Sequence, residues 1–431
     1  MNNSTFLAAT LAAFTLIFSV GARAQSADAP SKVEIGVQFS SVTIVPQWPN
    51  TGLGLAVGGS EISEAGFGGR FTFNLNRNFA LEAEGNFFPH ENFNEPAAGG
   101  QLTQGLFGLK AGKRFGKFGL FAKARPGFAH VTKAIAQLDT VVVDFNGTPI
   151  TFPIYGRRSK THFSMDLGGV LEFYPSRKVL TRFDVGDTII RYGNGSFFPT
   201  GFAPTSRTSH NLQISAGIGF RLGFLPPDEA RPQTHDDRQR FEVGAQFSSF
   251  GFTQVEPSAG SPSVDFRDTR TQPGFGGRFT YNVTSNFALE AQGDFFPRDA
   301  QLFNTGRAGG RTLQLQAGTK LGKRFERFGI FGKARPGVVS FSRTISFDGF
   351  ENDQGFLIPL FHEKRSSYFS LDLGGVLEFY PSRRLVTRFD AGDTMIRYRS
   401  IQLPIGFNGM ITAPAEMIHS FEFSAGVGFR F

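Results

Sequence analysis

Histidine and cysteine are the side chains best suited to metal binding and to acid–base or nucleophilic chemistry, and this chain provides few of them. The histidines are His90, His130, His162, His210, His235, His362 and His419. None of them has the spacing of a metal-ligand pair. The chain has no cysteine, which excludes thiol chemistry and a disulfide framework. We therefore expect no metal, no cofactor and no catalytic residue.

Charged side chains are abundant, but they alternate with apolar ones. Between residues 163 and 173, Phe163, Met165 and Leu167 share one parity, while Asp166 and Glu172 share the other. A period of two is typical of a β-strand with two unlike faces. In the first part of the chain the charged face carries Glu34, Arg70, Glu82, Glu84, Lys110, Arg114, Lys123, Arg125, Asp166, Glu172, Arg182, Asp184 and Arg221. In the second part it carries Glu242, Arg278, Glu290, Lys320, Arg324, Lys333, Arg335, Asp372, Glu378, Arg388, Asp390 and Arg430.

The two parts of the chain repeat one another. Residues 166–177 return letter for letter as residues 372–383, and segment 181–184 returns as 387–390. Repeats of this length have the size of domains and exceed solenoid modules. The prediction is a first unit at residues 32–224, a linker at 225–240 and a second unit at 241–431.

The N-terminal segment has the pattern of a secretory signal peptide. An apolar run from Phe6 to Val20 precedes the small-x-small cleavage site Ala22-Arg-Ala24, so residues 1–24 are predicted to be removed and residues 25–31 to form a polar tail. The alternative is an uncleaved anchor, for which about fifteen apolar residues are short of the roughly twenty that a spanning helix needs. The net charge of +8 could suggest nucleic acid, but an exported chain does not meet that partner, and we expect none.

Each unit contains eight predicted strands. In the first unit they are residues 33–42, 65–76, 79–89, 102–115, 118–130, 162–175, 179–192 and 210–222. In the second unit they are residues 241–250, 274–284, 287–297, 312–325, 328–341, 368–381, 385–398 and 419–431. Tight turns alternate with the long connections 43–64, 90–100, 133–160 and 194–208, so all short turns lie at one end of the sheet. A transmembrane barrel with short periplasmic turns and long external loops has this pattern.

The chemistry of the two faces distinguishes a membrane barrel from a soluble one. The apolar face of the first unit includes Val33, Ile35, Val37, Phe39, Phe71, Phe73, Phe79, Leu81, Phe163, Leu167, Leu212, Ala216 and Phe220. A soluble lipocalin-like barrel would turn this face inward and leave the charges in water. The large, Phe-rich apolar face and the nearly balanced charges of the other face favour apolar side chains toward lipid and charges inside. The predicted fold class is all-β, a transmembrane antiparallel up-and-down β-barrel.

With these strands and turns, both units resemble the small outer-membrane β-barrel family, the OmpA-like transmembrane domain. The closing strand ends in an aromatic residue, and Phe429 and Phe431 look like the signal read by the barrel-assembly machinery. The resemblance implies a non-enzymatic protein of the bacterial outer membrane with both termini periplasmic. Its expected partners are outer-membrane lipid, the assembly machinery and an external ligand that the sequence does not identify.

A catalytic alternative rests on His162-Phe-Ser164 with Glu172, which is similar to the His-x-Ser motif of barrel lipid A deacylases. His162 has inward parity, and the second unit has Tyr368 in its place. We therefore predict that the protein is not an enzyme.

Sixteen strands can form two small barrels or one porin-sized barrel. The linker 225–240 is longer than any short-side turn, and the inward charges of the first unit nearly balance, with six acidic and seven basic residues. Near balance suits a narrow lumen filled by ion pairs. The second unit is less balanced, with five acidic and seven basic residues, since Gln292 replaces Glu84. We predict two tandem eight-stranded barrels with a structural or surface-binding role; the alternative is a sixteen-stranded, porin-like channel for small solutes.

Two features conflict with this scheme. Pro126 and Pro336 lie inside the fifth strand of each unit, where they predict a bulge or the outer end of the strand. Asp187 and Asp393 fall on the lipid-facing parity, unless a bulge at the preceding glycine turns them inward.

Overall fold

The computed structural model describes residues 32–44, 62–89, 99–145, 148–192, 207–223, 239–256, 266–303, 306–353, 356–405 and 409–431. The predicted signal peptide, the polar tail and most of the predicted linker lie outside the described residues. Within the described ranges, no helix is long and apolar enough to cross a membrane.

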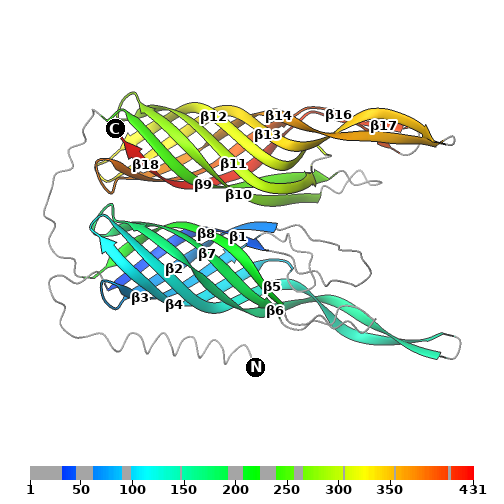
Figure 1. Cartoon of the computed structure of the whole chain (residues 1–431), viewed down its shortest axis with the longest axis horizontal. Coiled ribbons are helices and arrows are strands. Elements are labelled where there is room, and N and C mark those ends of the chain that lie inside the picture. Colours follow the sequence, from blue (N-terminus) through cyan, green and yellow to red (C-terminus); the bar gives the residue numbers. More distant parts are fainter. Residues whose placement is uncertain are drawn as a thin grey trace.

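The first unit forms a closed barrel. Its strands are β1 (Val33–Ile44), β2 (Ile62–Asn74), β3 (Phe79–Phe88), β4 (Leu102–Phe115), β5 (Phe118–Phe145), β6 (Thr148–Phe173), β7 (Val179–Tyr192) and β8 (Arg207–Leu222). Each strand pairs antiparallel with its neighbours in sequence (Figure 1). Val33 of β1 lies opposite Phe73 of β2 and opposite Leu222 of β8, so the ring of eight strands closes.

The second unit repeats this arrangement. Its barrel strands are β9 (Phe241–Glu256), β10 (Phe266–Asn282), β11 (Phe287–Phe303), β12 (Ala308–Arg324), β13 (Phe328–Asp353), β14 (Phe356–Phe379), β15 (Leu385–Tyr398) and β18 (Glu416–Arg430). β9 pairs with both β10 and β18, which closes the ring. Two short strands, β16 (Ile401–Ile405) and β17 (Gly409–Ala413), form a separate hairpin before β18.

The strand pairing is that of two eight-stranded barrels and not of the sixteen-stranded alternative. Among the described residues, the only ladder pair between the barrels joins Ser63 of β2 to Thr271 of β10. The barrels also contact each other through their outer walls, where the rings of Phe183 and Phe389 stack with centroids 5.9 Å apart. Ala216 was predicted to face lipid, but it is only 4% exposed because the second barrel covers it.

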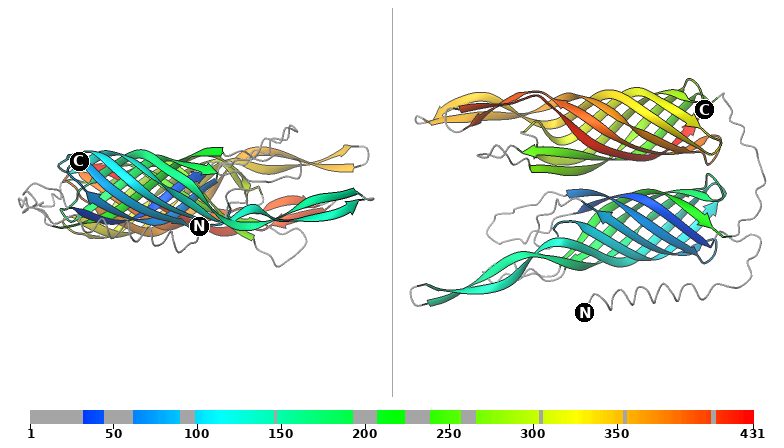
Figure 2. Two further views of the ribbon diagram at one scale, coloured as in Figure 1. Left: turned by 90° about the horizontal axis from the view of Figure 1, so that it is seen from below. Right: turned by 180° about the vertical axis from the view of Figure 1, so that it is seen from behind.

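The short turns of both barrels lie at one end, and two long hairpins project from the other (Figures 1 and 2). These hairpins correct one prediction: the expected loop 133–160 is largely strand, since β5 continues to Phe145 and β6 begins at Thr148. The strands continue to pair beyond the barrel after register shifts between Val131 and Ala134 and between Gln137 and Asp139. Beyond the barrel, β5 and β6 form backbone hydrogen bonds with each other, so an antiparallel ladder of two strands can continue there without further neighbours.

The prediction for the prolines was wrong. Pro126 lies well inside β5 and pairs with Met165 of β6 without any shift of register. On its other side the ladder with β4 passes from Leu106–Gly127 to Leu109–Ala124 in unbroken register, with pairs missing only between them. Pro336 has the same surroundings in β13. A proline removes one donor, and a local gap in one ladder is sufficient to accommodate it.

The bulge that would have turned Asp187 inward is absent, so its predicted lipid-facing parity holds. The register of β7 is continuous with β6 and β8, so Asp187 stays on the outer wall with its side chain 41% exposed. There it contacts His210, whose Nδ1 lies 2.6 Å from Asp187 Oδ2. Asp393 and His419 repeat the contact at 2.5 Å in the second barrel. A polar partner on the neighbouring strand therefore satisfies each outward carboxylate.

Candidate functional site

The charged face of the strands points into the barrels. Every residue of the predicted charged face is buried, except three arginines at the short-turn rim that are only partly buried. These are Arg114, Arg221 and Arg324, whose side chains are 13%, 12% and 6% exposed. The outer wall carries large exposed hydrophobics such as Val37, Phe67 and Leu321, at 66%, 61% and 64% exposure. An apolar outer wall of this kind is what lipid contact requires.

Arg182 is the centre of the ion pairs in the first barrel. Its guanidinium forms a bidentate pair with Glu82, with Nη2 2.9 Å from Oε2, and its Nε donates to Asp184 at 2.7 Å. Lys110 contacts the same Glu82 at 3.4 Å and Glu172 at 2.5 Å. Each carboxylate therefore meets at least one cation, which is the condition for burying charge at tolerable cost.

A second group of charges lies farther along the same lumen. Arg125 bridges Glu84 and Asp166, at 2.5 Å from each. Lys123 also contacts Asp166, at 2.8 Å. The pair Lys123 and Arg125 therefore belongs to the interior network and does not face an open pore.

The second barrel repeats the network, with the substitution of Gln292 for Glu84 that the sequence shows. Arg388 pairs with Glu290 and, at 3.0 Å, with Asp390. Gln292 takes the place of Glu84 and hydrogen-bonds to Arg335. Further pairs include Lys320 with Glu378 at 2.5 Å, Arg335 with Asp372 at 2.6 Å, Lys333 with Asp372 at 3.0 Å, Arg278 with Glu242 at 3.0 Å and Arg430 with Glu242 at 3.3 Å.

Two interior carboxylates of the second barrel were missed. Asp294 and Glu422 are each 1% exposed, where the first unit has Asn86 and Gln213. Asp294 has the same inward parity as Glu290, so the alternation contained the signal. With these two added to the five predicted carboxylates, the second lumen has seven acidic side chains. Their number equals that of the seven predicted basic side chains, so the predicted excess of basic residues disappears.

A tyrosine covers the network at the short-turn end of each barrel. The Tyr174 hydroxyl donates to Glu172 at 2.7 Å and accepts from Arg114 Nε at 3.1 Å, while the Arg221 guanidinium lies 5.0 Å from the ring centroid. Tyr380 makes the corresponding contacts in the second barrel. The prediction placed these tyrosines at the ends of strands 162–175 and 368–381 and gave them no role in the lumen.

The outer end of each lumen is apolar, which the sequence reasoning did not anticipate. In the first barrel the cluster comprises Val42, Ile44, Phe88, Leu102, Ala129, Val131, Ala134, Ile190 and Tyr192. In the second it comprises Phe250, Phe252, Phe296, Ala308, Val339, Phe341, Tyr368, Ile396, Tyr398 and Ile418. We call these clusters the outer caps. Together with the ion pairs they fill the interior from end to end, as an eight-stranded barrel permits.

The structure keeps Glu172 apart from His162 and Ser164, the other two residues of the hydrolase alternative. His162 lies near the middle of β6, at the level of the outer cap, with its ring 4.8 Å from that of Tyr192. Glu172 lies ten residues farther along the same strand, roughly 33 Å away at the usual rise per residue, and is held by Lys110 and Tyr174. Within the described part of the chain, no group of three or more metal-ligating side chains occurs.

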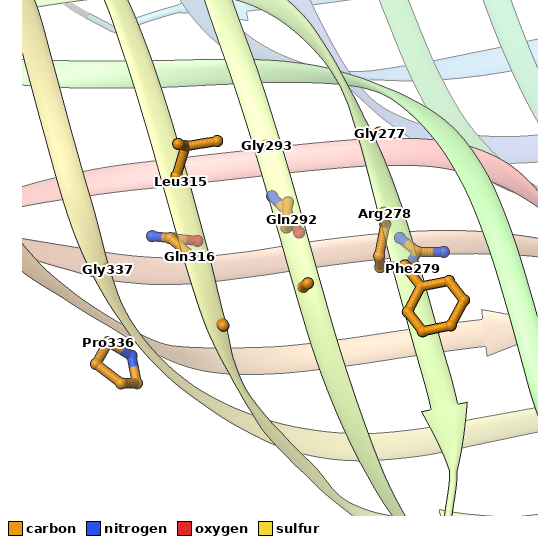
Figure 3. A pocket seen from close by; sticks show the side chains of 11 residues that line it. Gly277, Arg278, Phe279, Gln292, Gly293, Leu315, Gln316, Pro336 and Gly337 are labelled. Carbon is orange, nitrogen blue, oxygen red and sulfur yellow. The ribbon is translucent and has the colours of Figure 1, made fainter.

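The outer wall of the second barrel has an apolar groove of about 570 Å³ across β10 to β13 (Figure 3). Phe279 and Leu315 border it, at 44% and 54% exposure, whereas Gln292 and Gln316 behind it are buried. In the first barrel, Phe107 stands where the second has Ala317 and is 50% exposed. The groove therefore results from a small residue in one repeat, and its place in the apolar wall makes lipid its natural neighbour.

The outer end of the second barrel has a cleft of a different character. It encloses about 670 Å³ between the base of the β13–β14 hairpin and the segment that follows β15. Four cationic side chains line it, namely Arg307, Lys364, Arg365 and Arg399. No residue of the cleft had been singled out in the sequence, because its cations come from segments that only the fold brings together.

Comparison with known proteins gives no family assignment. No model of a protein family matches the chain, and no curated protein matches it. The solved structures that match include Neisserial surface protein A, with 13% identity over 44% of this chain and 98% of that chain and a TM-score of 0.27. Another is the N-terminal β-barrel domain of Pseudomonas aeruginosa OprF, with 14% identity over 45% of this chain and 98% of that chain and a TM-score of 0.23. A third is Ail of Yersinia pestis in complex with the heparin analogue sucrose octasulfate, with 12% identity over 44% of this chain and 99% of that chain and a TM-score of 0.25. Values this low transfer no function to this chain.

The closed rings, the apolar outer walls and the filled interiors define the class to which the chain belongs. It is a transmembrane antiparallel β-barrel protein whose two barrels each have their own lumen.

Proposed function

We propose that this chain is a non-enzymatic protein of the bacterial outer membrane, which anchors external binding surfaces and does not conduct solutes. One observation carries the proposal: each ring of eight strands closes on itself, and ion pairs and an outer cap fill its lumen. A porin-like channel needs a continuous path of water, for which a wider barrel is required.

The external end is the part that we assign to binding. The β5–β6 and β13–β14 hairpins extend past the barrels at the end opposite the short turns (Figure 2). In this arrangement the short turns and both termini are periplasmic. The hairpins would meet ligands at the cell surface, as long loops of membrane barrels commonly do.

We also assign Phe429 and Phe431 to the assembly signal. Phe431 closes the second ring, where its backbone N–H donates to Phe241 O at 2.9 Å and its carbonyl oxygen accepts from Phe241 N–H at 3.1 Å. The Phe431 side chain is 57% exposed, which leaves it accessible to the assembly machinery.

Planar-bilayer conductance of the refolded full-length protein tests the absence of a pore. We expect no current steps above the bare bilayer under conditions in which a sixteen-stranded porin conducts. Steps whose size changes in Glu82→Gln would contradict the proposal, because that residue lies inside the lumen. Steps unaffected by this substitution would indicate a contaminating porin.

A further inference from the structure

The cleft at the outer end of the second barrel gathers cations from three separate segments of the chain. Arg307 immediately precedes β12, Lys364 and Arg365 belong to β14, and Arg399 follows β15. All of them lie beyond the outer cap, on the side from which the long hairpin projects. The cleft is therefore accessible from the medium that the hairpins face.

Two of the four cations are fixed by other groups. Arg307 is 3% exposed, its Nη1 lies 3.2 Å from Glu416 Oε1, and its carbonyl accepts from the Tyr368 hydroxyl at 2.9 Å. Lys364 Nζ donates to Ser346 Oγ at 2.9 Å. A ligand would therefore meet side chains whose positions are already set, which lowers the entropy cost of binding.

The other two cations are not neutralised. Arg365 and Arg399 are exposed, and neither forms an ion pair with any residue that the structure describes. The described lining of the cleft contains no carboxylate. Guanidinium groups present a planar fork that matches sulfate and phosphate oxygens, and such charge-assisted hydrogen bonds are the strong ones.

The neutral lining is suited to a saccharide. Ser366, Ser367 and Ser400 contribute hydroxyls, which can donate to and accept from sugar hydroxyls. Phe347 and Tyr368 contribute aromatic surface, which combines apolar area with little loss of side-chain entropy.

A second cleft, of about 490 Å³, shares Arg365 with the first and adds Arg311 and Arg343. Arg343 contacts Glu363 at 3.8 Å, but the two side chains are 31% and 60% exposed, so this pair is weak. Two clefts joined by one arginine can accept several anionic groups along one molecule. This arrangement favours a multiply charged ligand over a single small ion.

We propose that the outer end of the second barrel binds an anionic saccharide carrying sulfate or phosphate groups, with Arg365 and Arg399 as the principal contacts. The inference depends on the external placement of this end in the proposed function. A saccharide with sulfate or phosphate groups can come from two sources, a soluble polysaccharide or the phosphorylated sugar of a glycolipid in the outer leaflet.

The first barrel does not repeat the site. In the alignment of the repeats, Ser159 and Gly193 stand where the second unit has Arg365 and Arg399. The first hairpin carries Arg157 and Arg158 instead, both exposed. The double variant Arg157→Gln/Arg158→Gln therefore removes the same charge from the same end of the molecule, and serves as a matched control.

The test is calorimetric titration of the refolded full-length protein in detergent with sulfated dextran, and with uncharged dextran as the control probe. Wild type should bind only the sulfated polymer, and more weakly at high salt. Arg365→Gln/Arg399→Gln should weaken binding by at least about tenfold, since each lost charge-assisted bond is worth that much. The matched control should stay within about twofold of wild type. Equal loss in both variants would overturn the proposal, because it would indicate attraction by net charge alone.

The source of the ligand is tested in nanodiscs that contain lipopolysaccharide or only phosphatidylcholine. Binding of sulfated dextran that lipopolysaccharide does not compete away supports a soluble polymer. Retention of lipopolysaccharide that the cleft variant loses and the control keeps supports a glycolipid. If neither probe distinguishes the two variants, the site is refuted. Heat-dependent gel mobility shows that each variant is folded, and conductance tests the proposed function separately.

Discussion

Removing the charge of Arg182 while keeping its bulk should destabilise the first barrel strongly. In Arg182→Met, Glu82 loses its bidentate partner but keeps Lys110 at 3.4 Å and Arg125 at 3.5 Å. Asp184 loses the 2.7 Å bond and keeps Arg70 at 3.8 Å, the one other cation within ion-pair distance among the described residues. Breaking a buried ion pair on one side costs about 3–5 kcal/mol. The remaining cations place the expected loss of unfolding free energy near the lower end, about 3 kcal/mol.

The assay is urea unfolding of the full-length protein in detergent, followed by gel mobility without boiling. A protease site in the predicted linker allows the halves to be separated after incubation and scored individually. A loss of about 3 kcal/mol corresponds to a midpoint lower by roughly 1–3 M urea, given ordinary denaturant slopes. Arg388→Met should do the same to the second barrel only, because it occupies the equivalent position there.

The double variant Glu82→Gln/Arg182→Met separates ion pairing from packing. Because it removes both charges, its loss should be smaller than the sum of the single losses by about 0.5–3 kcal/mol. Single variants within about 0.5 kcal/mol of wild type, or strictly additive losses, would refute the account of a lumen closed by ion pairs.

The remaining predictions concern the strand contacts, the outer wall and the outer cap. Gly127→Ala should prevent folding, because a Cβ there would lie 1.9 Å from a carbonyl oxygen of the facing strand. Gly116→Asn should fold, because Gly116 has a φ of 55°, which asparagine tolerates, and open space around it. Equal fractions of heat-modifiable protein for the two variants would contradict this prediction. Asp187→Asn should cost less than about 1 kcal/mol in urea unfolding, since its contact with His210 is exposed, and a loss as large as that of Arg182→Met would be inconsistent with the exterior placement. Phe341→Ala, which empties part of a fully buried cap, should cost about 3–5 kcal/mol without creating conductance; a new conductance would mean that the cap alone closes the lumen.

Alternation of residue type made most of the barrel predictable. The predicted strand 102–115 coincides with β4, and 179–192 coincides with β7. The same alternation assigned Arg182 and Asp184 to the lumen, where they are buried. A period of two is determined by the pleat alone, so these inferences needed no knowledge of neighbouring strands.

The features that were missed depend on context that alternation does not encode. Phe341 and Tyr398 have inward parity, but the prediction assumed a lumen that is polar throughout, and only the position along the barrel axis distinguishes a cap from the network. Asp294 and Glu422 were passed over because the second unit was interpreted through the charges of the first. The basic cleft could not be predicted because Arg307 and Arg399 are far apart in sequence and the fold alone makes them neighbours.

The proline error has a physical origin as well. A proline inside a sheet is expected at an edge or a bulge because it lacks a donor. Here the ladder beside Pro126 opens locally while the register continues. Gly108 of β4, in register with the neighbouring Arg125, lies so close to β5 that a Cβ there would be 2.1 Å from Ala124 O. A glycine opposite the residue before the proline therefore lets the two strands approach closely without a bulge.

The independence of the two barrels is the central claim, and separate refolding tests it most directly. Residues 25–230 and 236–431 would each be refolded in detergent, and their gel mobility compared before and after boiling. Two closed and filled barrels predict that each half alone gives a compact, heat-modifiable form. If neither half folds under conditions in which the full chain does, the strands share one barrel and the account is wrong.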